Sequence, residues 1–213
     1  MTLPTLPSDL CSYASWETAW APYDQATYEA VLDFLRPADA VIEIGAGDLR
    51  LACQMAARVR QVTAIEINST VLALAPHKLP VNLHVVCGDA RTLAYPRASV
   101  GVLLMRHCTH FPLYVTRLRS AGCSRLVTNA RWRMGVELLD LELSRLAYAL
   151  FQGGWYACSC GAVGFKACSP DDITSENAMA CTEVSACPAC AGLVGAEYRP
   201  PKYNKGPLYR EDL

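Results

Sequence analysis

Short apolar runs alternate with helical patterns along most of the chain. Apolar residues at helical spacing within residues 16–35, followed by Pro37, predict an entry helix. The next apolar runs are short, rich in β-branched residues and end in turn residues, which predicts buried strands at 40–44, 61–67, 82–87, 100–105 and 125–129. Helical spacing predicts intervening helices at 51–59, 70–75 and 113–120, and a long amphipathic helix through 136–150.

This alternation predicts an α/β fold with a doubly wound, mainly parallel sheet and helices on both of its faces. At 213 residues the chain is long enough for one sizeable core and a small appendage. We expect four parts: an entry segment at 1–36, a Rossmann-like cofactor-binding domain at 37–152, a zinc-ribbon segment at 153–195 and a basic, aromatic tail at 196–213.

Composition places the chain among globular proteins, because 52% of its residues are apolar and 18% are charged. Apolar runs such as Val102 to Met105 are far shorter than the ~20 residues that span a membrane. Residues 1–10 contain no basic residue and no apolar stretch typical of a secretory signal. We therefore expect a cytoplasmic protein that does not cross a membrane.

Charge is segregated along the chain, although the net charge is only −1. Residues 90–136 contain eight arginines and no acidic residue. Such a stretch could contact the phosphates of a nucleic acid. The alternative is that the arginines form ion pairs with Asp140, Glu142 or the acidic N-terminal half.

Glycines and acidic residues follow three of the predicted strands. Gly45 and Gly47 come after the first, Glu66 ends the second and Asp89 follows the third. In a doubly wound sheet, ligands bind outside the carboxyl ends of the strands, where glycine allows close approach to the backbone and a carboxylate can accept from a ribose diol. A nicotinamide dinucleotide is disfavoured, because the third glycine of G-x-G-x-x-G would fall on Arg50.

The segment Val41-Ile-Glu-Ile-Gly-Ala-Gly-Asp48 resembles the first motif of class I S-adenosylmethionine-dependent methyltransferases. Ala64-Ile-Glu66 and Cys87-Gly-Asp-Ala90 resemble its later motifs, and the likeness covers roughly residues 20–150. The third glycine of the family's E-x-G-x-G-x-G is Leu49 here, and we expect this leucine to narrow the cofactor's approach.

The resemblance implies S-adenosylmethionine as cofactor and assigns roles to the motif residues. Gly45 and Gly47 would line its methionine part, Glu66 would hold the ribose hydroxyls and Asp89 would accept from the adenine amino group, while Glu43 orders the turn. Ala90 and Arg106 complete the cofactor-binding residues that it implies.

Acceptors usually meet the cofactor of this family at the end of the fourth strand, which reads Arg106-His107-Cys108-Thr109-His110-Phe111. No Asn-Pro-Pro-Tyr motif of the adenine-modifying enzymes is present. His107 or His110 could act as the catalytic base, because imidazole titrates near neutral pH. The alternative is that both histidines cap or pack beside the strand. Trp20, Tyr23 and Tyr28 are candidates to line the pocket, or equally to pack in the core.

Two close cysteine pairs mark the C-terminal region. Cys158-x-Cys160 and Cys187-Pro-Ala-Cys190 lie 26 residues apart, which is a spacing at which two tight turns supply four thiolates to a structural zinc ion. Cys168 or Cys181 could replace one of these ligands. Buried core thiols and a redox or disulfide site are the alternatives.

These observations favour a methyltransferase whose acceptor is a nucleic acid, RNA in particular, or a protein, rather than a small molecule. A non-catalytic scaffold protein, which uses its zinc ribbon to contact a partner, is the alternative from another class. A thiol-based sensor is the third.

Overall fold

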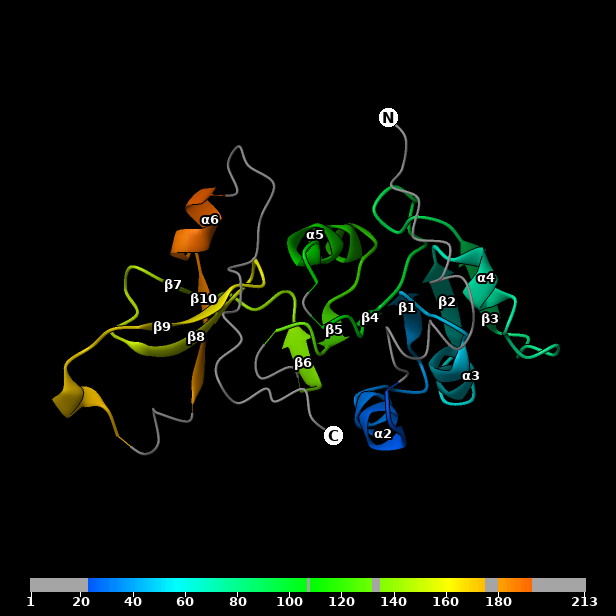
Figure 1. The fold of residues 1–213 in the computed structure, drawn as a ribbon, viewed down its shortest axis with the longest axis horizontal. Helices are drawn as coiled ribbons and strands as arrows, with labels where there is room; N and C mark the ends of the chain where they lie inside the picture. The colour runs from blue at the N-terminus through cyan, green and yellow to red at the C-terminus, as the bar shows by residue number, and fades with distance from the viewer. Residues whose placement is uncertain (1–22, 107, 132–134, 175–179, 193–213) are drawn as a thin grey trace, which may run out of the picture.

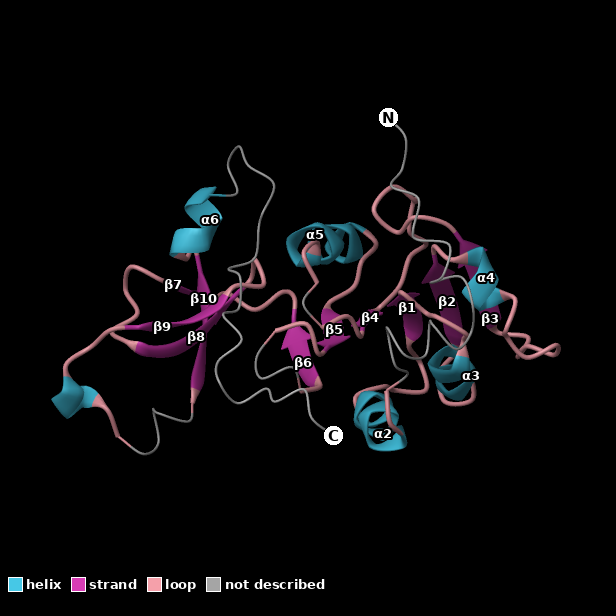
Figure 2. Ribbon diagram, viewed as in Figure 1, coloured by secondary structure: helices cyan, strands magenta, loops and turns pink. Residues whose placement is uncertain are grey.

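The structure is a computed structural model that describes residues 23–106, 108–131, 135–174 and 180–192 (Figure 1). Its helices are α2 (Gln25–Asp33), α3 (Arg50–Ala56), α4 (Ser69–Leu72), α5 (Phe111–Ser120) and α6 (Pro188–Gly192), with a 3₁₀ turn at Pro170–Asp172. Its strands form two sheets, drawn in magenta in Figure 2.

The first sheet has the strand order β3-β2-β1-β4-β5-β6. Its strands are β1 (Ala40–Ile44), β2 (Gln61–Glu66), β3 (Leu83–Cys87), β4 (Val100–Leu103), β5 (Arg125–Thr128) and β6 (Glu137–Asp140). All pairings are parallel except that of β6 with β5. Strand β1 lies near the centre, and every residue of its sequence Ala-Val-Ile-Glu-Ile is buried, as in a strand that is covered on both faces. The order reverses between β1 and β4, which places the ligand crevice at the carboxyl ends of these strands.

Helices cover both faces of this sheet. Helices α2 and α3 bury Val31, Leu32 and Met55 against one face, and α5 buries Phe111 and Leu118 against the other. Figure 1 shows α2 and α3 below the sheet and α5 above it. The predicted fold class is confirmed.

The predicted helix through 136–150 is wrong. This stretch contains β6 and the two-residue strand β7 (Leu146–Ala147) instead. Leu139 is buried on the sheet while Leu143, Leu146 and Leu150 are exposed, so the leucines do not form one helical face. These leucines are distributed over short strands and loops, although their spacing matches that of a helix. Periodicity alone does not distinguish the two cases.

The second sheet has the order β7-β10-β8-β9, with β8 (Gly154–Cys158), β9 (Val163–Lys166) and β10 (Cys181–Ser185). Strand β7 belongs to it, although it precedes residue 153, where we expect the zinc-ribbon segment to begin. Among the described residues no strand of this sheet pairs with the first, so it is a separate layer (Figure 1). Cysteines and aromatic residues make up most of its small core.

None of the described helices is long and apolar enough to cross a bilayer.

Candidate functional site

A turn with three left-handed residues connects β1 to α3. Gly45, Gly47 and Leu49 have φ angles of 76°, 57° and 68°. The first two are glycine, which adopts this conformation without steric cost, and the third is the leucine at the family's third glycine. A left-handed leucine costs roughly 1–2 kcal/mol. The turn therefore keeps the backbone form of a three-glycine loop in spite of the substitution.

The side chain of Leu49 is only 1% exposed and belongs to the core that α2 and α3 share with the sheet. It points into the protein interior. Its cost is thus backbone strain rather than lost room for a ligand, contrary to our expectation that it narrows the cofactor's approach.

The carboxylate of Glu66 holds this turn from the neighbouring strand. Its Oε2 accepts from the Gly47 amide at 2.9 Å, and its Oε1 accepts from the Asn68 amide at 2.8 Å. Each carboxylate oxygen can accept a further hydrogen bond. Glu66 is partly exposed, so this remaining capacity is open to the hydroxyls of a ligand.

Glu43 lies beneath the turn and is 5% exposed. Burial, together with the negative charges of Glu66 and Asp48, raises the pKa of Glu43 to about 8. Its Oε2 has no hydrogen-bond partner. At neutral pH this carboxyl group is therefore mostly protonated. Its unpaired oxygen can form a hydrogen bond with a ligand or with a water molecule at the glycine turn.

Asp89 follows β3 at the same edge. Its two oxygens accept from the Arg91 side chain at 2.7–3.0 Å, and Oδ1 also accepts from the Arg91 amide. These hydrogen bonds lower the pKa of Asp89. The Arg91 Nη1 atom lies 3.4 Å from Nε2 of His110, the residue that precedes α5. Ala90, the next predicted cofactor residue, is buried and accepts from the Tyr95 hydroxyl through its carbonyl at 2.8 Å.

Residues after β4 lie close to the glycine turn. A Cβ atom added to Gly45 would come within 3.2 Å of the Met105 side chain. The Tyr23 hydroxyl donates to the Leu104 carbonyl at 3.4 Å, and the Arg106 guanidinium lies over the Tyr23 ring. The structure thus brings Arg106 to the carboxyl end of β4.

Of the other predicted acceptor-site residues, His110 is exposed, and Tyr28 is buried in the core, where burial raises its pKa to about 12. His107 and Trp20 lie outside the described residues.

Asn129 was not predicted from the sequence. It follows β5, is fully buried and has no hydrogen-bond partner for either atom of its amide. A buried amide without partners is costly, so it marks a position that bound water or a ligand would satisfy. The sequence signal was present, since Asn129, like Glu66 and Asp89, lies at the carboxyl end of a buried strand.

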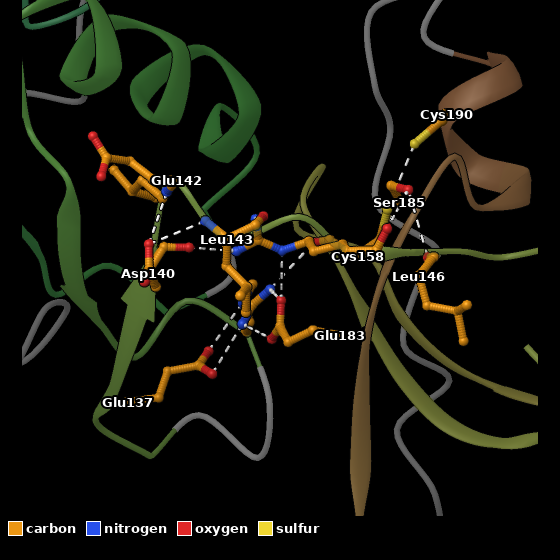
Figure 3. A network of polar contacts seen from close by, with 12 residues as sticks. Glu137, Asp140, Glu142, Leu143, Leu146, Cys158, Glu183, Ser185 and Cys190 are labelled. Atoms are coloured by element: carbon orange, nitrogen blue, oxygen red, sulfur yellow. Dashed lines mark hydrogen bonds and ion pairs between the residues drawn. The ribbon is translucent and has the colours of Figure 1, made fainter.

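Cys158, Cys160, Cys187 and Cys190 lie together in the second layer, with all four sulfur atoms within 4.8 Å of one another. The Cys158–Cys190 and Cys160–Cys187 sulfur pairs are each 3.6 Å apart. Tetrahedral zinc with Zn–S bonds of ~2.3 Å places its sulfur ligands about 3.8 Å apart, so the cluster has the dimensions of a zinc site. Figure 3 shows Cys158 and Cys190 converging from β8 and α6.

The thiols of this cluster interact strongly. A hydrogen bond from Cys160 lowers the pKa of Cys158, and the same bond raises the pKa of Cys160. Cys168 and Cys181 are not members of the cluster. The four cysteines of the two sequence pairs are therefore the donor set that fits a metal.

The arginine-rich stretch is largely engaged within the protein. Arg125 pairs with Asp39, and Arg131 pairs with Glu137 and Glu183. Arg117 and Arg119 donate to backbone carbonyls. Among the described arginines, internal partners thus engage most of the stretch, as the alternative interpretation of its charge pattern expects. Asp39 and Asp89, which pair with Arg125 and Arg91, belong to the acidic N-terminal half, whereas Arg131 pairs with Glu137 and Glu183 rather than with Asp140 or Glu142.

Residues 41–127 match the family model of the methyltransferase domain. The predicted resemblance to class I methyltransferases is confirmed over this segment. No curated protein is significantly similar to the chain in sequence.

Several solved structures resemble part of the chain. Precorrin 8w decarboxylase from Methanobacterium thermoautotrophicum is 18% identical over 50% of this chain and 63% of its own, with a TM-score of 0.45. An amino pentose methyltransferase from Micromonospora echinaspora is 22% identical over 56% of both chains, with a TM-score of 0.45. A dimethyladenosine transferase from Plasmodium falciparum is 19% identical over 49% of this chain and 41% of its own, with a TM-score of 0.44. The chain thus spans less than two thirds of the length of each.

Proposed function

We propose that this chain, whose residues 41–127 carry a methyltransferase domain, transfers methyl groups from S-adenosylmethionine. One observation carries the proposal. The left-handed turn after β1 is held by the carboxylate at the end of β2, through the Gly47 amide and Glu66 Oε2 at 2.9 Å. The backbone of the glycine turn, which a ligand can approach, therefore lies beside the carboxylate of Glu66, which can accept further hydrogen bonds. This arrangement suits a ligand that consists of a nucleoside and a polar tail.

The proposed contacts follow from this geometry. The backbone at Gly45 and Gly47 would accommodate the methionine part, and Glu66 would accept from the ribose hydroxyls. Arg106, placed after β4 over the ring of Tyr23, would supply a cation for the methionine carboxylate. Asp89 and Ala90 would border the adenine.

When bound, the cofactor supplies an electrophilic methyl group on its sulfonium. The protein has to hold the acceptor in line with that group and remove its proton. His110 is an exposed imidazole beside Arg91 and could accept this proton from the rim of the site. His107 is the second candidate base from the sequence.

For the acceptor we propose RNA or a protein. The second layer lies beside the domain and could enlarge its contact surface to the size that a macromolecule needs (Figure 1). The arginine stretch supports RNA less strongly than its sequence implies, because most of its side chains have internal partners.

The acceptor class can be tested with radiolabelled cofactor and cell extract. The proposal predicts label in macromolecules, which ribonuclease releases if the acceptor is RNA and protease releases if it is protein. Incorporation should be lost in a Gly45→Arg variant. Label only in small molecules would contradict the acceptor class, and no label would contradict the activity.

The four clustered thiolates are proposed to hold one structural zinc ion. A closed set of four protein ligands leaves no open position for substrate, so this metal would support folding rather than catalysis. The layer is too small to be stable on its few buried residues alone. Reduced thiols of this kind suit the cytoplasm, which remains the proposed compartment.

A non-catalytic scaffold is the second candidate. Arg91 engages both oxygens of Asp89, the residue that would accept from adenine, and this favours a domain that has lost its cofactor. Such a protein would bind neither S-adenosylmethionine nor its demethylated product.

A further inference from the structure

The second layer, which carries the four clustered cysteines, contacts the methyltransferase domain next to the proposed cofactor site. The turn that presents Cys158 and Cys160 continues into Gly161, which has a φ of 89°. A Cβ atom added there would come within 2.9 Å of the Phe111 ring. Phe111 is the first residue of α5 and follows His110 directly. The cysteine turn therefore packs against the start of α5 with no room to spare.

A second contact runs through Arg131, three residues beyond the end of β5. Its side chain is fully buried, and its Nη1 atom donates to the Cys158 carbonyl at 3.3 Å. The guanidinium also lies 5.9 Å from the centre of the Phe111 ring. One side chain thus contacts both a metal-ligand residue and the first residue of α5.

Two acids from the two layers hold this guanidinium in place. Glu137 of β6 accepts from Nε and Nη2 at 3.1 and 3.0 Å, and Glu183 of β10 accepts from Nη2 and Nη1 at 2.5 and 3.2 Å. Figure 3 shows Glu137 and Glu183 converging from the two sheets. Burial would raise the pKa of Glu183, but the hydrogen bonds and charge of Arg131 lower it. A buried cation with two acids cannot shift without leaving a buried charge unpaired.

The start of α5 is close to the rim of the proposed cofactor site. His110 lies 3.4 Å from Arg91, which is itself bound to Asp89. A movement of Phe111 would therefore displace His110 and the groups next to the adenine position.

We propose that Arg131 is a positioning residue through which metal binding at the four cysteines fixes the start of α5 and strengthens cofactor binding. The inference rests on the proposed function, because it concerns the affinity of that same site. With the metal bound, the cysteine turn holds Gly161 and the Cys158 carbonyl in place, and these fix Phe111 and Arg131. Without it, backbone hydrogen bonds still form the turn, but only weak thiol contacts join it to Cys187 and Cys190.

The test compares Arg131→Gln with Arg145→Gln. The buried guanidinium of Arg145 also donates to Glu183, from Nε at 2.9 Å, but its other hydrogen bonds go to the carbonyls of Asp140 and Leu143 rather than to Cys158 or α5. The measurements are zinc content, thermal stability, S-adenosylhomocysteine affinity by calorimetry, and amide hydrogen exchange of residues 108–120. Arg131→Lys keeps the charge and serves if Arg131→Gln does not fold.

We expect Arg131→Gln to keep its zinc, to bind S-adenosylhomocysteine about tenfold more weakly and to exchange faster at the start of α5. Arg145→Gln should lose stability but retain wild-type affinity and exchange. Removal of zinc from the wild-type protein by a chelator should weaken binding by a similar factor, and bound S-adenosylhomocysteine should in turn slow zinc loss.

Equal effects of the two variants would overturn the proposal, since general stability would then explain both. Wild-type affinity and exchange in Arg131→Gln would overturn it as well. If the zinc-loaded wild-type protein binds no S-adenosylhomocysteine, the proposed function fails. Hydrogen exchange of α5, with and without zinc, then decides the coupling alone, and unchanged exchange would contradict it.

Discussion

Asp89 accepts hydrogen bonds from Arg91 through both of its carboxylate oxygens, with Nη2 at 2.7 Å from Oδ2 and Nε at 2.9 Å from Oδ1. Together with the Arg91 amide, these contacts use most of the acceptor capacity of the carboxylate. The Arg91 side chain is 37% exposed, so it can turn away toward solvent. An adenine amino group would therefore compete with Arg91 for Asp89.

Replacing Arg91 with alanine should remove this competitor. An exposed ion pair contributes up to about 1 kcal/mol, so Arg91→Ala is expected to bind S-adenosylmethionine about two- to fivefold more tightly, and Asp89→Ala more weakly than wild type. Calorimetric titration measures both, with the exposed Arg58→Ala as the control. Weaker binding by Arg91→Ala would mean that the arginine itself contacts the cofactor.

Much of the first sheet could be predicted from the sequence because its strands are short, buried and bounded by turns. The positions of Glu66 and Asp89 followed from the same pattern, since parallel strands end at one edge. The engagement of Asp89 by Arg91 could not be predicted, because a neighbouring side chain can point to solvent equally well.

The C-terminal half was less predictable. The two cysteine pairs identified four side chains that do lie together. The leucines at 139, 143, 146 and 150 predicted a helix where the chain forms β6, a loop and β7. Arg131 joins residues far apart in the sequence, and no local pattern identifies such a contact.

Leu49 offers a test of backbone strain against core packing. Leu49 and Leu51 are both buried, but Leu49 has a φ of 68° and Leu51 lies within α3. Glycine relieves strain at the first position and weakens the helix at the second, by roughly 1 kcal/mol each. Leu49→Gly should therefore be less destabilising than Leu51→Gly by about 2 kcal/mol in urea unfolding. Equal losses would contradict a strained turn.

Glu43 should make stability depend on pH. Its pKa is raised from 4.5 to about 8 in the folded protein, so between these values the folded state holds a proton that the unfolded state has released. The free energy of unfolding should therefore fall as pH rises through this window and level off above it.

The Glu43→Gln side chain cannot titrate, so this variant should not show the decrease in the free energy of unfolding that Glu43 causes as pH rises. Relative to wild type, it should gain stability from pH 5 to pH 8 by an amount on the order of 3 kcal/mol. Denaturant unfolding across this range measures the difference, with the exposed Glu29→Gln as the matched control. A wild-type slope in Glu43→Gln would show that the carboxyl group is ionised in the folded protein.

The cysteine cluster should retain one zinc ion per chain through dialysis. Cys187→Ser should lose the metal and unfold the second layer, because Cys187 is buried within the cluster. Cys168→Ser should keep it, since Cys168 lies outside the cluster. Elemental analysis of the dialysed proteins gives the stoichiometry. Equal zinc loss from both variants would exclude the assigned ligand set.

The central claim, that the glycine turn binds S-adenosylmethionine, is tested most directly by calorimetry on wild type, Gly45→Arg and Gly122→Arg. Both glycines have left-handed φ angles, 76° and 92°, but Gly122 lies after α5, where a Cβ atom meets nothing closer than 3.5 Å. The account predicts that wild type and Gly122→Arg bind S-adenosylmethionine and that a folded Gly45→Arg does not. Absence of binding to the folded wild-type protein, or undiminished binding to Gly45→Arg, would contradict it.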